Sequence, residues 1–239
     1  MNYIGSKHKL SSFLKKAIKD TVGSDLSQLV FCDLFAGTGI VGRNFKPLVK
    51  QIITNDVEFY SYVLNRNYIG NHTSLKTQNH LAFLNNLEGK EGFIFHHYCE
   101  NGNEGRLYFS SENGKKIDGI RQQIEAWKRT KEISEDAYYF LLASLIESAD
   151  KVANTASVYG AYLKKIKKSA QKTLTLLPAT FTLTKNTHQV FNEDGNALIH
   201  KIKGDILYLD PPYNARQYGS NYHILNTIAK YDTFIPKGK

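Results

Sequence analysis

The chain has 239 residues, 41% of them hydrophobic and 12% aromatic, a composition that supports a folded core and excludes a disordered protein. No apolar run reaches the roughly 20 residues that a membrane helix needs, and the polar N-terminus lacks the apolar core of a signal peptide, so we expect a cytoplasmic protein. The formal net charge of +9 would suit ribosomal, membrane-surface and nucleic-acid proteins alike, so its distribution matters more than its size. Two cysteines far apart in the chain, Cys32 and Cys99, suggest free buried thiols rather than a disulfide framework.

The N-terminal part of the chain shows the repeating pattern of a parallel α/β sheet. Apolar residues at helical spacing predict an amphipathic helix over residues 6–20. An apolar run over 29–34 predicts a buried strand, which leads into a glycine turn and then a helix. A second strand is expected over 51–55 and a further helix over 57–68. Strand, turn, helix and strand in succession predict an α/β domain.

The middle of the chain breaks this pattern and is mainly helical. Residues 98–116 are rich in Gly, Asn, Ser and Glu, which indicates loops, and a helix is expected over 111–129. A second long helix is expected to begin after a cap at Ser134. Strands return over 189–193 and 205–210, with a short helix between them.

The return of the strand pattern indicates an insertion rather than two domains in tandem. We expect an α/β domain formed by residues 1–70 and 186–239, with residues 71–185 as an inserted helical lobe. Between Lys151 and Asn192 there is no acidic residue, which favours a polyanionic partner, although a lysine run is usually only a solvated face. The lysines of this stretch are Lys151, Lys164, Lys165, Lys167, Lys168, Lys172 and Lys185.

The strongest motif is Asp210-Pro211-Pro212-Tyr213 at the end of an apolar strand, where open α/β sheets bind ligands. Asp210 and the Pro211 carbonyl are acceptors that could each take one N–H of an aromatic amine, leaving its lone pair to point at a methyl donor. Adjacent prolines end the strand and stiffen the turn. Tyr213 would stack on the flipped base that carries this amine, an interaction worth about 1–3 kcal/mol. An ordinary Asp-Pro turn is the alternative, and four such residues after an apolar strand make it the less favoured one.

A second motif runs from Asp33 to Gly39 with the sequence DLFAGTG. Glycine allows the backbone to approach a ligand closely, although the spacing lacks the third glycine of the dinucleotide fingerprint. Asp56 follows at the end of the next strand, where an acidic residue commonly holds ribose hydroxyls. Together these features predict a site for an adenosyl cofactor.

A cluster of His96, His97 and Cys99 invites a metal-binding interpretation. Adjacent histidines on a strand point to opposite faces of the sheet. We therefore expect no metal site there.

In their order and approximate spacing, these motifs resemble the D12 class of adenine-N6 DNA methyltransferases, which includes the Dam-type enzymes. The matching pieces are residues 2–7, 33–39, 55–56, 192–194 and 210–213. The Asp-Pro-Pro-Tyr tetrapeptide is specific to amino-methylating enzymes. Each of the other pieces is weak evidence for the family by itself, but their common order along the chain makes them strong evidence together. The resemblance implies an α/β fold with a Rossmann-like, S-adenosylmethionine-dependent methyltransferase sheet and an inserted, mainly helical target-recognition lobe.

The resemblance also implies a role for each motif. Tyr3 and Lys7 would contact the methionine end of the cofactor, with Lys7 facing its carboxylate or, alternatively, remaining solvated. Asp56 would hold the ribose hydroxyls, and Asp194 would hold the adenine amine of the cofactor, with capping of the following helix as the alternative. The target adenine would be held by residues 210–213. The cofactor pocket would be lined by Asp33, Phe35, Gly37, Thr38 and Gly39.

Residues 149–165 look like the subgroup found in type II restriction–modification systems. This likeness implies duplex DNA as the substrate and a cognate restriction endonuclease as a candidate partner, without a stable complex between them. Small and polar residues permit close approach, lysines supply phosphate contacts, and Asn154 and Arg121 are candidates for reading base edges. The expected DNA-binding residues are Asn154, Lys164, Lys165, Lys167 and Lys168.

The chain departs from the family pattern at its C-terminal end, where the family continues with further strands. We therefore expect the strand before Asp210 to lie at an exposed sheet edge, in a fragment, a truncated chain or half of a split enzyme. The leading interpretation is direct methyl transfer to N6 of a flipped adenine in duplex DNA. The alternatives are amino-methylation of RNA or of a protein glutamine, where Asn usually replaces Asp210, and a catalytically silent cofactor- or DNA-binding protein.

Overall fold

The structure is a computed structural model that describes residues 7–211 and 218–236. These residues form two compact units, one made of residues 7–74 and 180–211 and the other of residues 75–179 and 218–236. In this described part of the chain, no helix is both long enough and apolar enough to cross a membrane.

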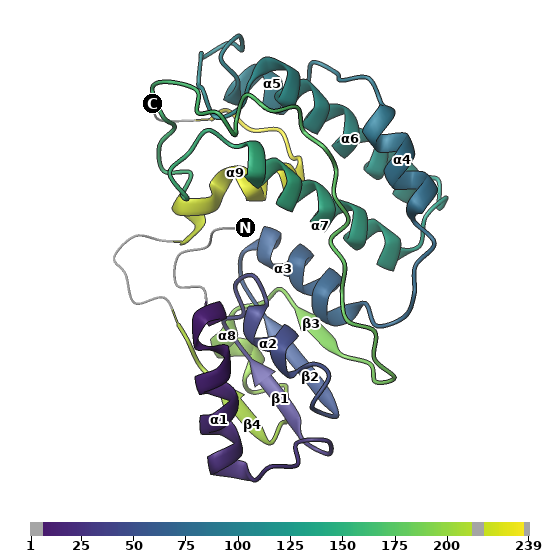
Figure 1. Cartoon of the computed structure of the whole chain (residues 1–239), viewed down its shortest axis with the longest axis vertical. Coiled ribbons are helices and arrows are strands. Elements are labelled where there is room, and N and C mark those ends of the chain that lie inside the picture. Colours follow the sequence, from purple (N-terminus) through teal and green to yellow (C-terminus); the bar gives the residue numbers. More distant parts are fainter. Residues whose placement is uncertain (1–6, 212–217, 237–239) are drawn as a thin grey trace. The chain divides into compact units, whose positions relative to one another are not determined.

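The first unit, which we call the sheet unit, is built on a parallel sheet with the strand order β3-β2-β1-β4 (Figure 1). All three strand pairs are parallel, and the four strands confirm the predicted ones with slightly shorter bounds for three of them. Their bounds are β1 (Val30–Asp33), β2 (Gln51–Asn55), β3 (Gln189–Phe191) and β4 (Ile206–Tyr208). As predicted, β4 lies at the edge of the described sheet, and Leu207 and Leu209 are about half exposed there.

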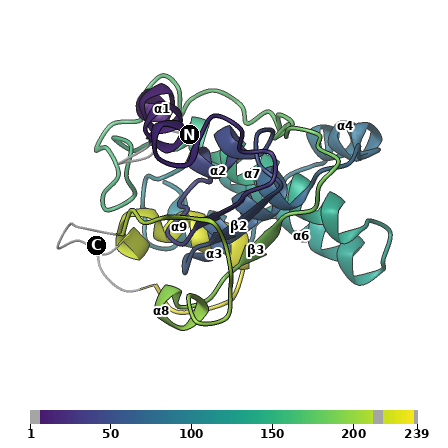
Figure 2. The ribbon, with the colours of Figure 1, turned by 90° about the horizontal axis from the view of Figure 1, so that it is seen from below.

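The helices of the sheet unit follow the predicted pattern with local differences. The predicted N-terminal helix is confirmed, but its first turn is a 3-10 helix. The predicted helix over 57–68 ends as a π-helix. Figure 2 shows α1 and α2 on one side of the sheet and α8 on the other. The bounds are η1 (Lys7–Leu10), α1 (Ser11–Val22), α2 (Ile40–Phe45), α3 (Phe59–Asn65), η2 (Arg66–Gly70) and α8 (Gly195–Leu198).

The core of the sheet unit lies between the sheet and α2. Phe31 of β1 stacks on Phe45 of α2 with ring centroids 4.7 Å apart, and both rings are fully buried. Ile52 of β2 belongs to the same cluster, and Leu14 and Ile18 of α1 pack against it from outside. Full burial of such side chains contributes about 1.5–3 kcal/mol each, so this cluster fixes the strands on which the site depends.

The strand order reverses at β1. The chain runs outward from β1 to β2 and β3 and then returns to place β4 on the other side of β1. In open α/β sheets, ligands bind outside the carboxyl ends of the strands at this switch point. The order of the strands therefore directs attention to the loops that follow β1 and β4.

The second unit, the helical unit, contains the two long helices that the sequence predicts. Ser110 and Ser134 are their N-caps, accepting the N–H groups of Asn113 at 3.3 Å and Ala137 at 3.2 Å. Two shorter helices, α4 and α5, were not predicted. The helices are α4 (Gln78–Asn86), α5 (Phe93–Tyr98), α6 (Ser111–Arg129), α7 (Glu135–Val152) and α9 (Tyr218–Lys230).

His96 and His97 lie on α5, not on a strand, so the strand argument against a metal site was wrong. The reason is a buried carboxylate on α6. Asp118 accepts the N–H groups of Gly92, Ile94 and Phe95 at 3.1, 3.0 and 2.8 Å and thereby caps the start of α5. Such a long-range cap leaves no local signal in the sequence.

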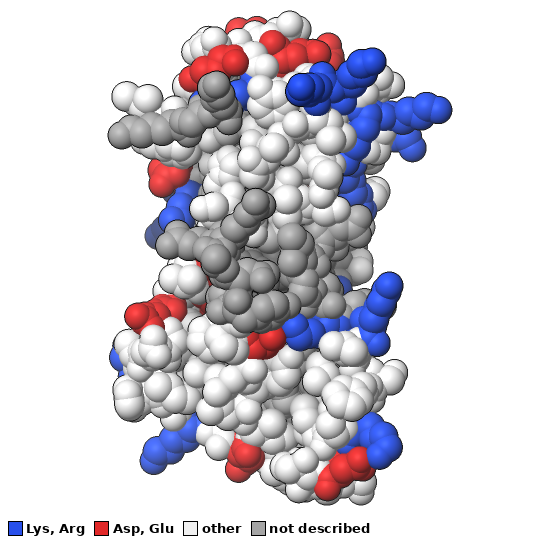
Figure 3. All heavy atoms as spheres, turned by 90° about the vertical axis from the view of Figure 1, so that its left-hand side faces the viewer, with Lys and Arg blue, Asp and Glu red and all other residues white. Residues whose placement is uncertain are grey.

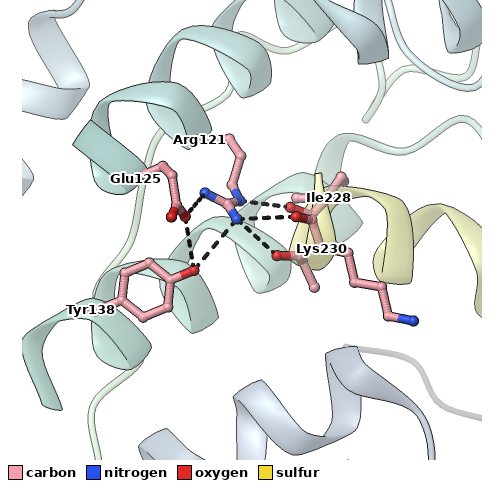
Figure 4. Close-up of polar contacts among 6 residues, drawn as sticks. Arg121, Glu125, Tyr138, Ile228 and Lys230 are labelled. Atoms are coloured by element: carbon pink, nitrogen blue, oxygen red, sulfur yellow. Dashed lines mark hydrogen bonds and ion pairs between the residues drawn. The ribbon is translucent and has the colours of Figure 1, made fainter. Parts of the chain in front are cut away.

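The helix α9 belongs to the helical unit, whereas the sequence pattern assigned residues 186–239 to the α/β domain. The buried Arg121 of α6 explains the difference (Figure 4). Its guanidinium donates to the carbonyls of Ile228 at 3.1 Å, Ala229 at 3.1 Å and Lys230 at 3.4 Å, which are left unpaired at the end of α9. Glu125 balances the charge at 2.8 Å.

We expect Arg121→Met to destabilise the fold by about 3–5 kcal/mol, because it leaves Glu125 and several helix carbonyls without their buried partner. Urea denaturation measures this change in the free energy of unfolding. The matched control is Arg129→Met, an exposed arginine on the same helix, with an expected change within about 0.5 kcal/mol. Equal effects of the two substitutions would contradict the anchoring role of Arg121.

Candidate functional site

Three of the predicted motifs meet at the carboxyl edge of the sheet. Asp33 is the last residue of β1, Asp56 directly follows β2, and Asp210 follows β4. The strand register pairs Asp33 with Tyr208, two residues before Asp210. Sequence motifs about 180 positions apart are thus neighbours at the switch point of the sheet.

The turn after β1 has a backbone that only glycine adopts readily. Gly37 and Gly39 have φ angles of 54° and 74°, in the left-handed region. A Cβ atom at Gly39 would lie only 2.6 Å from Oδ1 of Asn65, so there is no space for a side chain. Asn65 also donates to the carbonyl of Gly37 at 3.0 Å. Thr38, between the glycines, is half-buried.

Asp56 joins the loop after β2 to the glycine turn. Its Oδ2 accepts the N–H of Gly37 at 2.7 Å, and its Oδ1 accepts the N–H of Glu58 at 2.9 Å. Burial raises the pKa of Asp56 to about 6, and these two hydrogen bonds partly oppose the rise. Each carboxylate oxygen has a further lone pair, which is the chemistry that a pair of ribose hydroxyls requires.

Two asparagine amides hold the loops after β1, β2 and β3 together. Asn55 donates to the carbonyls of Leu34 at 3.2 Å and Glu193 at 3.0 Å, and its own oxygen accepts the Glu193 N–H at 2.9 Å. Asn192 donates to the carbonyl of Asp56 at 2.6 Å. Asn55 and Asn192 lie in the motifs that carry the resemblance, but no role was predicted for either, and Asn65 was not predicted at all. Their partners are backbone atoms of distant loops, which sequence spacing does not reveal.

Asp194 is the N-cap of α8, and its side chain accepts the N–H of Asn196 at 2.8 Å. This is the capping alternative that the sequence left open. Phe35 lies beside the next residue, since a Cβ atom at Gly195 would be 3.5 Å from two of its ring carbons. The half-buried Phe35 ring and the exposed Asp194 therefore lie close to one another at the same edge of the sheet.

Asp33 is the most unusual group of the site because only 1% of its surface is exposed and neither oxygen makes a well-formed hydrogen bond to a described residue. Burial and the neighbouring Asp56 and Asp210 carboxylates raise its pKa to about 8, although the Phe35 N–H and Lys7 partly oppose this. A buried acidic group whose oxygens lack a well-formed hydrogen bond is suited to receive a cationic or hydrogen-bonding ligand.

Asp210 forms an ion pair with Lys7, with Nζ and Oδ2 2.5 Å apart and both side chains largely buried. The two residues come from opposite ends of the chain. Burial, followed by the charges of Asp210 and Asp33, raises the pKa of the nearby Tyr208 to about 12. Of the other predicted site residues, Pro211 is exposed, and Tyr3, Pro212 and Tyr213 lie outside the described residues.

The predicted DNA-binding residues divide into exposed and buried groups. Asn154 is fully buried, with both amide hydrogens donated to the carbonyls of Leu107 and Leu163 at 2.9 Å and its oxygen accepting the Lys167 N–H at 3.0 Å. Because the side chain is fully buried and both amide hydrogens are engaged, it does not reach a base edge. The buried Arg121 likewise donates its hydrogen bonds to α9 and Glu125. The expectation that Asn154 and Arg121 read base edges is therefore wrong.

Some lysines of the same segment are exposed and can contact a ligand at the surface. Lys164, Lys165 and Lys168 are exposed, whereas Lys167 is half-buried and donates to the carbonyl of Thr155 at 2.6 Å. On the face drawn in Figure 3, Lys and Arg side chains form several separate groups with Asp and Glu between them. Three exposed lysines in one acid-free segment are suited to phosphate contacts, which position a nucleic acid without reading its sequence.

The profile of the family described as D12 class N6 adenine-specific DNA methyltransferase matches residues 3–239. The type II methyltransferase M.NlaIII of Neisseria lactamica is 64% identical over 240 residues, covering 100% of this chain and 72% of that relative. M.CviAII of Paramecium bursaria Chlorella virus 1 is 44% identical, covering 95% and 68%, and M.FokI of Planomicrobium okeanokoites is 42% identical, covering 97% of this chain and 37% of that relative. No solved structure shows a significant match.

The raised pKa of Asp33 predicts a loss of stability at high pH. Between its ordinary value of 3.8 and the folded value of about 8, the folded state holds a proton that the unfolded state has released. The free energy of unfolding therefore falls as pH rises through this range, by at most about 1.4 kcal/mol per pH unit for one proton. We expect Asp33→Asn to flatten this dependence in urea denaturation series between about pH 5 and 8. The exposed Asp20→Asn is the control, and an unchanged slope in Asp33→Asn would exclude the buried proton.

Proposed function

Because the chain belongs to the D12 class of N6 adenine-specific DNA methyltransferases, we propose that it is a site-specific enzyme that transfers a methyl group from S-adenosylmethionine to N6 of a flipped adenine in duplex DNA. The observation that carries this proposal is the position of Asp33, the glycine turn and Asp210 at one sheet edge. The named relatives are type II methyltransferases, so we propose a role in restriction–modification, with a cognate endonuclease in the same system.

The sheet unit holds the groups that suit the cofactor. The buried Asp33, whose oxygens lack a well-formed hydrogen bond, would face the methionine end, where the positive charge of the ligand would favour its ionised form, and Asp56 would hold the ribose hydroxyls. The left-handed backbone at Gly37 and Gly39 allows close approach of the ligand. Phe35 would lie against the adenine ring and Asp194 beside its amine. When bound, the cofactor supplies a methyl group on a sulfonium, a strong electrophile.

Asp210 and the Pro211 carbonyl would hold the target amine. Each accepts one N–H, which favours a pyramidal nitrogen and turns its lone pair toward the methyl group. The nitrogen would attack the methyl carbon directly, the N–C bond forming as the S–C bond breaks and its electron pair stays on sulfur, with no covalent enzyme intermediate; the proton that the amine loses would leave through Asp210 or water. Pro212 and Tyr213 keep their predicted roles as turn and stacking partner for the base, and Tyr3 keeps its predicted role at the cofactor.

The alternatives differ in the acceptor. Methylation of a protein glutamine is disfavoured because Asp, not Asn, stands at position 210. For duplex DNA, Lys164, Lys165 and Lys168 would contact phosphates, and Lys167 would contribute less because it already donates to Thr155. Competition among duplex DNA, RNA and protein substrates separates these classes.

Asp210→Ala is expected to abolish methyl transfer, because it removes an acceptor for the target amine. The measurement is transfer of radiolabelled methyl from S-adenosylmethionine to unmethylated duplex DNA, with the label identified as N6-methyladenine. The dissociation constant for S-adenosylhomocysteine should change less than about threefold, since Asp210 acts on the base. Asp20→Ala, an exposed aspartate of the same unit, should retain activity. Loss of cofactor binding in Asp210→Ala would refute the assigned role.

DNA affinity is expected to fall steeply with salt, because bound phosphates release counterions. Replacing Lys164, Lys165 and Lys168 together by glutamine should reduce the slope of log K against log salt concentration by about 2 to 3. The charge-matched control replaces Lys16, Lys19 and Lys50, which are exposed in the sheet unit. Fluorescence anisotropy of labelled duplex DNA gives both slopes, and equal losses would mean that the lysine segment is only a solvated face.

A further inference from the structure

The ion pair between Lys7 and Asp210 gives Lys7 a place that the family resemblance did not assign. The resemblance placed Lys7 against the carboxylate of the cofactor and Asp210 against the target amine. In the structure the two side chains meet directly, with Nζ and Oδ2 2.5 Å apart. The pair is largely buried, with 19% of the Lys7 side chain and 29% of the Asp210 side chain exposed, so it is less screened by solvent than a surface pair.

The backbone of Lys7 is tied to the elements that form the site. Ser11 at the start of α1 donates to the carbonyl of Lys7 at 3.4 Å. Asn44 of α2 donates to the hydroxyl of Ser11 at 2.8 Å, and α2 is the helix that follows the glycine turn. Leu14 and Ile18 of α1 pack on the core. Hydrogen bonds through Ser11 thus connect the Lys7 backbone to α2, while its ammonium reaches the residue that follows β4.

A contact at one oxygen restricts the rotation of a carboxylate. Lys7 contacts Oδ2 of Asp210, so Oδ1 is the oxygen that is more available to accept an N–H of the target amine. Asp33 lies near enough for its charge and that of Asp210 to affect each other, and Lys7 is the cation that offsets this repulsion at Asp33. Without Lys7, Asp210 would be free to turn and would lose its compensating charge.

We propose that Lys7 is a positioning residue that orients the Asp210 carboxylate for the target amine, rather than a contact of the cofactor carboxylate. This inference rests on the proposed function. It predicts that loss of Lys7 affects turnover and leaves cofactor affinity nearly unchanged. A cofactor contact would show the reverse, because the ligand would lose a charge-assisted hydrogen bond in its ground state.

The first experiment compares the full chain with Lys7→Met and Lys7→Arg, and uses exposed Lys19→Met on α1 as the control. Calorimetry gives dissociation constants for S-adenosylhomocysteine and for 5′-methylthioadenosine, which lacks the amino-acid carboxylate. We expect Lys7→Met to change both constants less than about threefold and to lower kcat about 100-fold, a loss that a misplacement of about 1 Å can cause. Lys7→Arg should recover at least about a tenth of the activity, because it restores the cation.

Two results would overturn the proposal. One is a loss of more than about tenfold in affinity for S-adenosylhomocysteine but not for 5′-methylthioadenosine, which would assign Lys7 to the cofactor carboxylate. The other is an unchanged kcat in Lys7→Met.

A second experiment tests the pair without any activity. Denaturation midpoints of Lys7→Met, Asp210→Asn and the double variant form a cycle in the ligand-free protein. We expect the double variant to be no less stable than the less stable single variant, and additive losses would count against the pair. If the unsubstituted chain transfers no methyl group, the proposed function fails, whereas the cycle still reports on Lys7 and Asp210.

Discussion

The parallel pairing of β1 with β2 on one side and β4 on the other is the constraint on which the whole site depends. It places the ends of three strands at one edge, so that Asp33, Asp56 and Asp210 lie close together although the chain separates them widely. The stacking of Phe31 on Phe45 fixes α2 against this sheet and thereby fixes the glycine turn between them. The chemistry of the edge is thus a consequence of strand order and core packing.

Gathering acidic groups at this edge has an electrostatic cost that the ligand-free protein meets in different ways. The carboxylate of Asp56 is stabilised by hydrogen bonds from two backbone N–H groups, and that of Asp210 by an ion pair with the ammonium of Lys7. Burial raises the pKa of Asp33 to about 8, above the value of about 6 for Asp56, because the oxygens of Asp33 make no well-formed hydrogen bond to a described residue and Lys7 opposes the rise only in part. Binding sites commonly contain groups that lower the stability of the ligand-free protein, because their positions suit contacts with a ligand.

Local signals predicted the sheet unit well and the helical unit in part. Apolar runs that end in Asp33, Asn55 and Asp210 gave the strands, and Ser134 gave the start of α7, because each signal is contained within a few neighbouring residues. Several of the failures involve partners outside the local sequence. Asn154 and Arg121 look like base readers in the sequence, yet backbone carbonyls far along the chain engage both side chains. The cap that Asp118 provides for α5 escaped notice for the same reason.

The sheet unit and the helical unit have different proposed roles. The described residues proposed for the cofactor and for the target amine all lie in the sheet unit, on loops whose positions are set by strand ends and asparagine amides. The proposed phosphate contacts lie in the helical unit, where Arg121 holds α9 to α6 through its carbonyl contacts. Because strand ends and asparagine amides of the sheet unit itself hold these loops, their geometry depends on contacts within that unit.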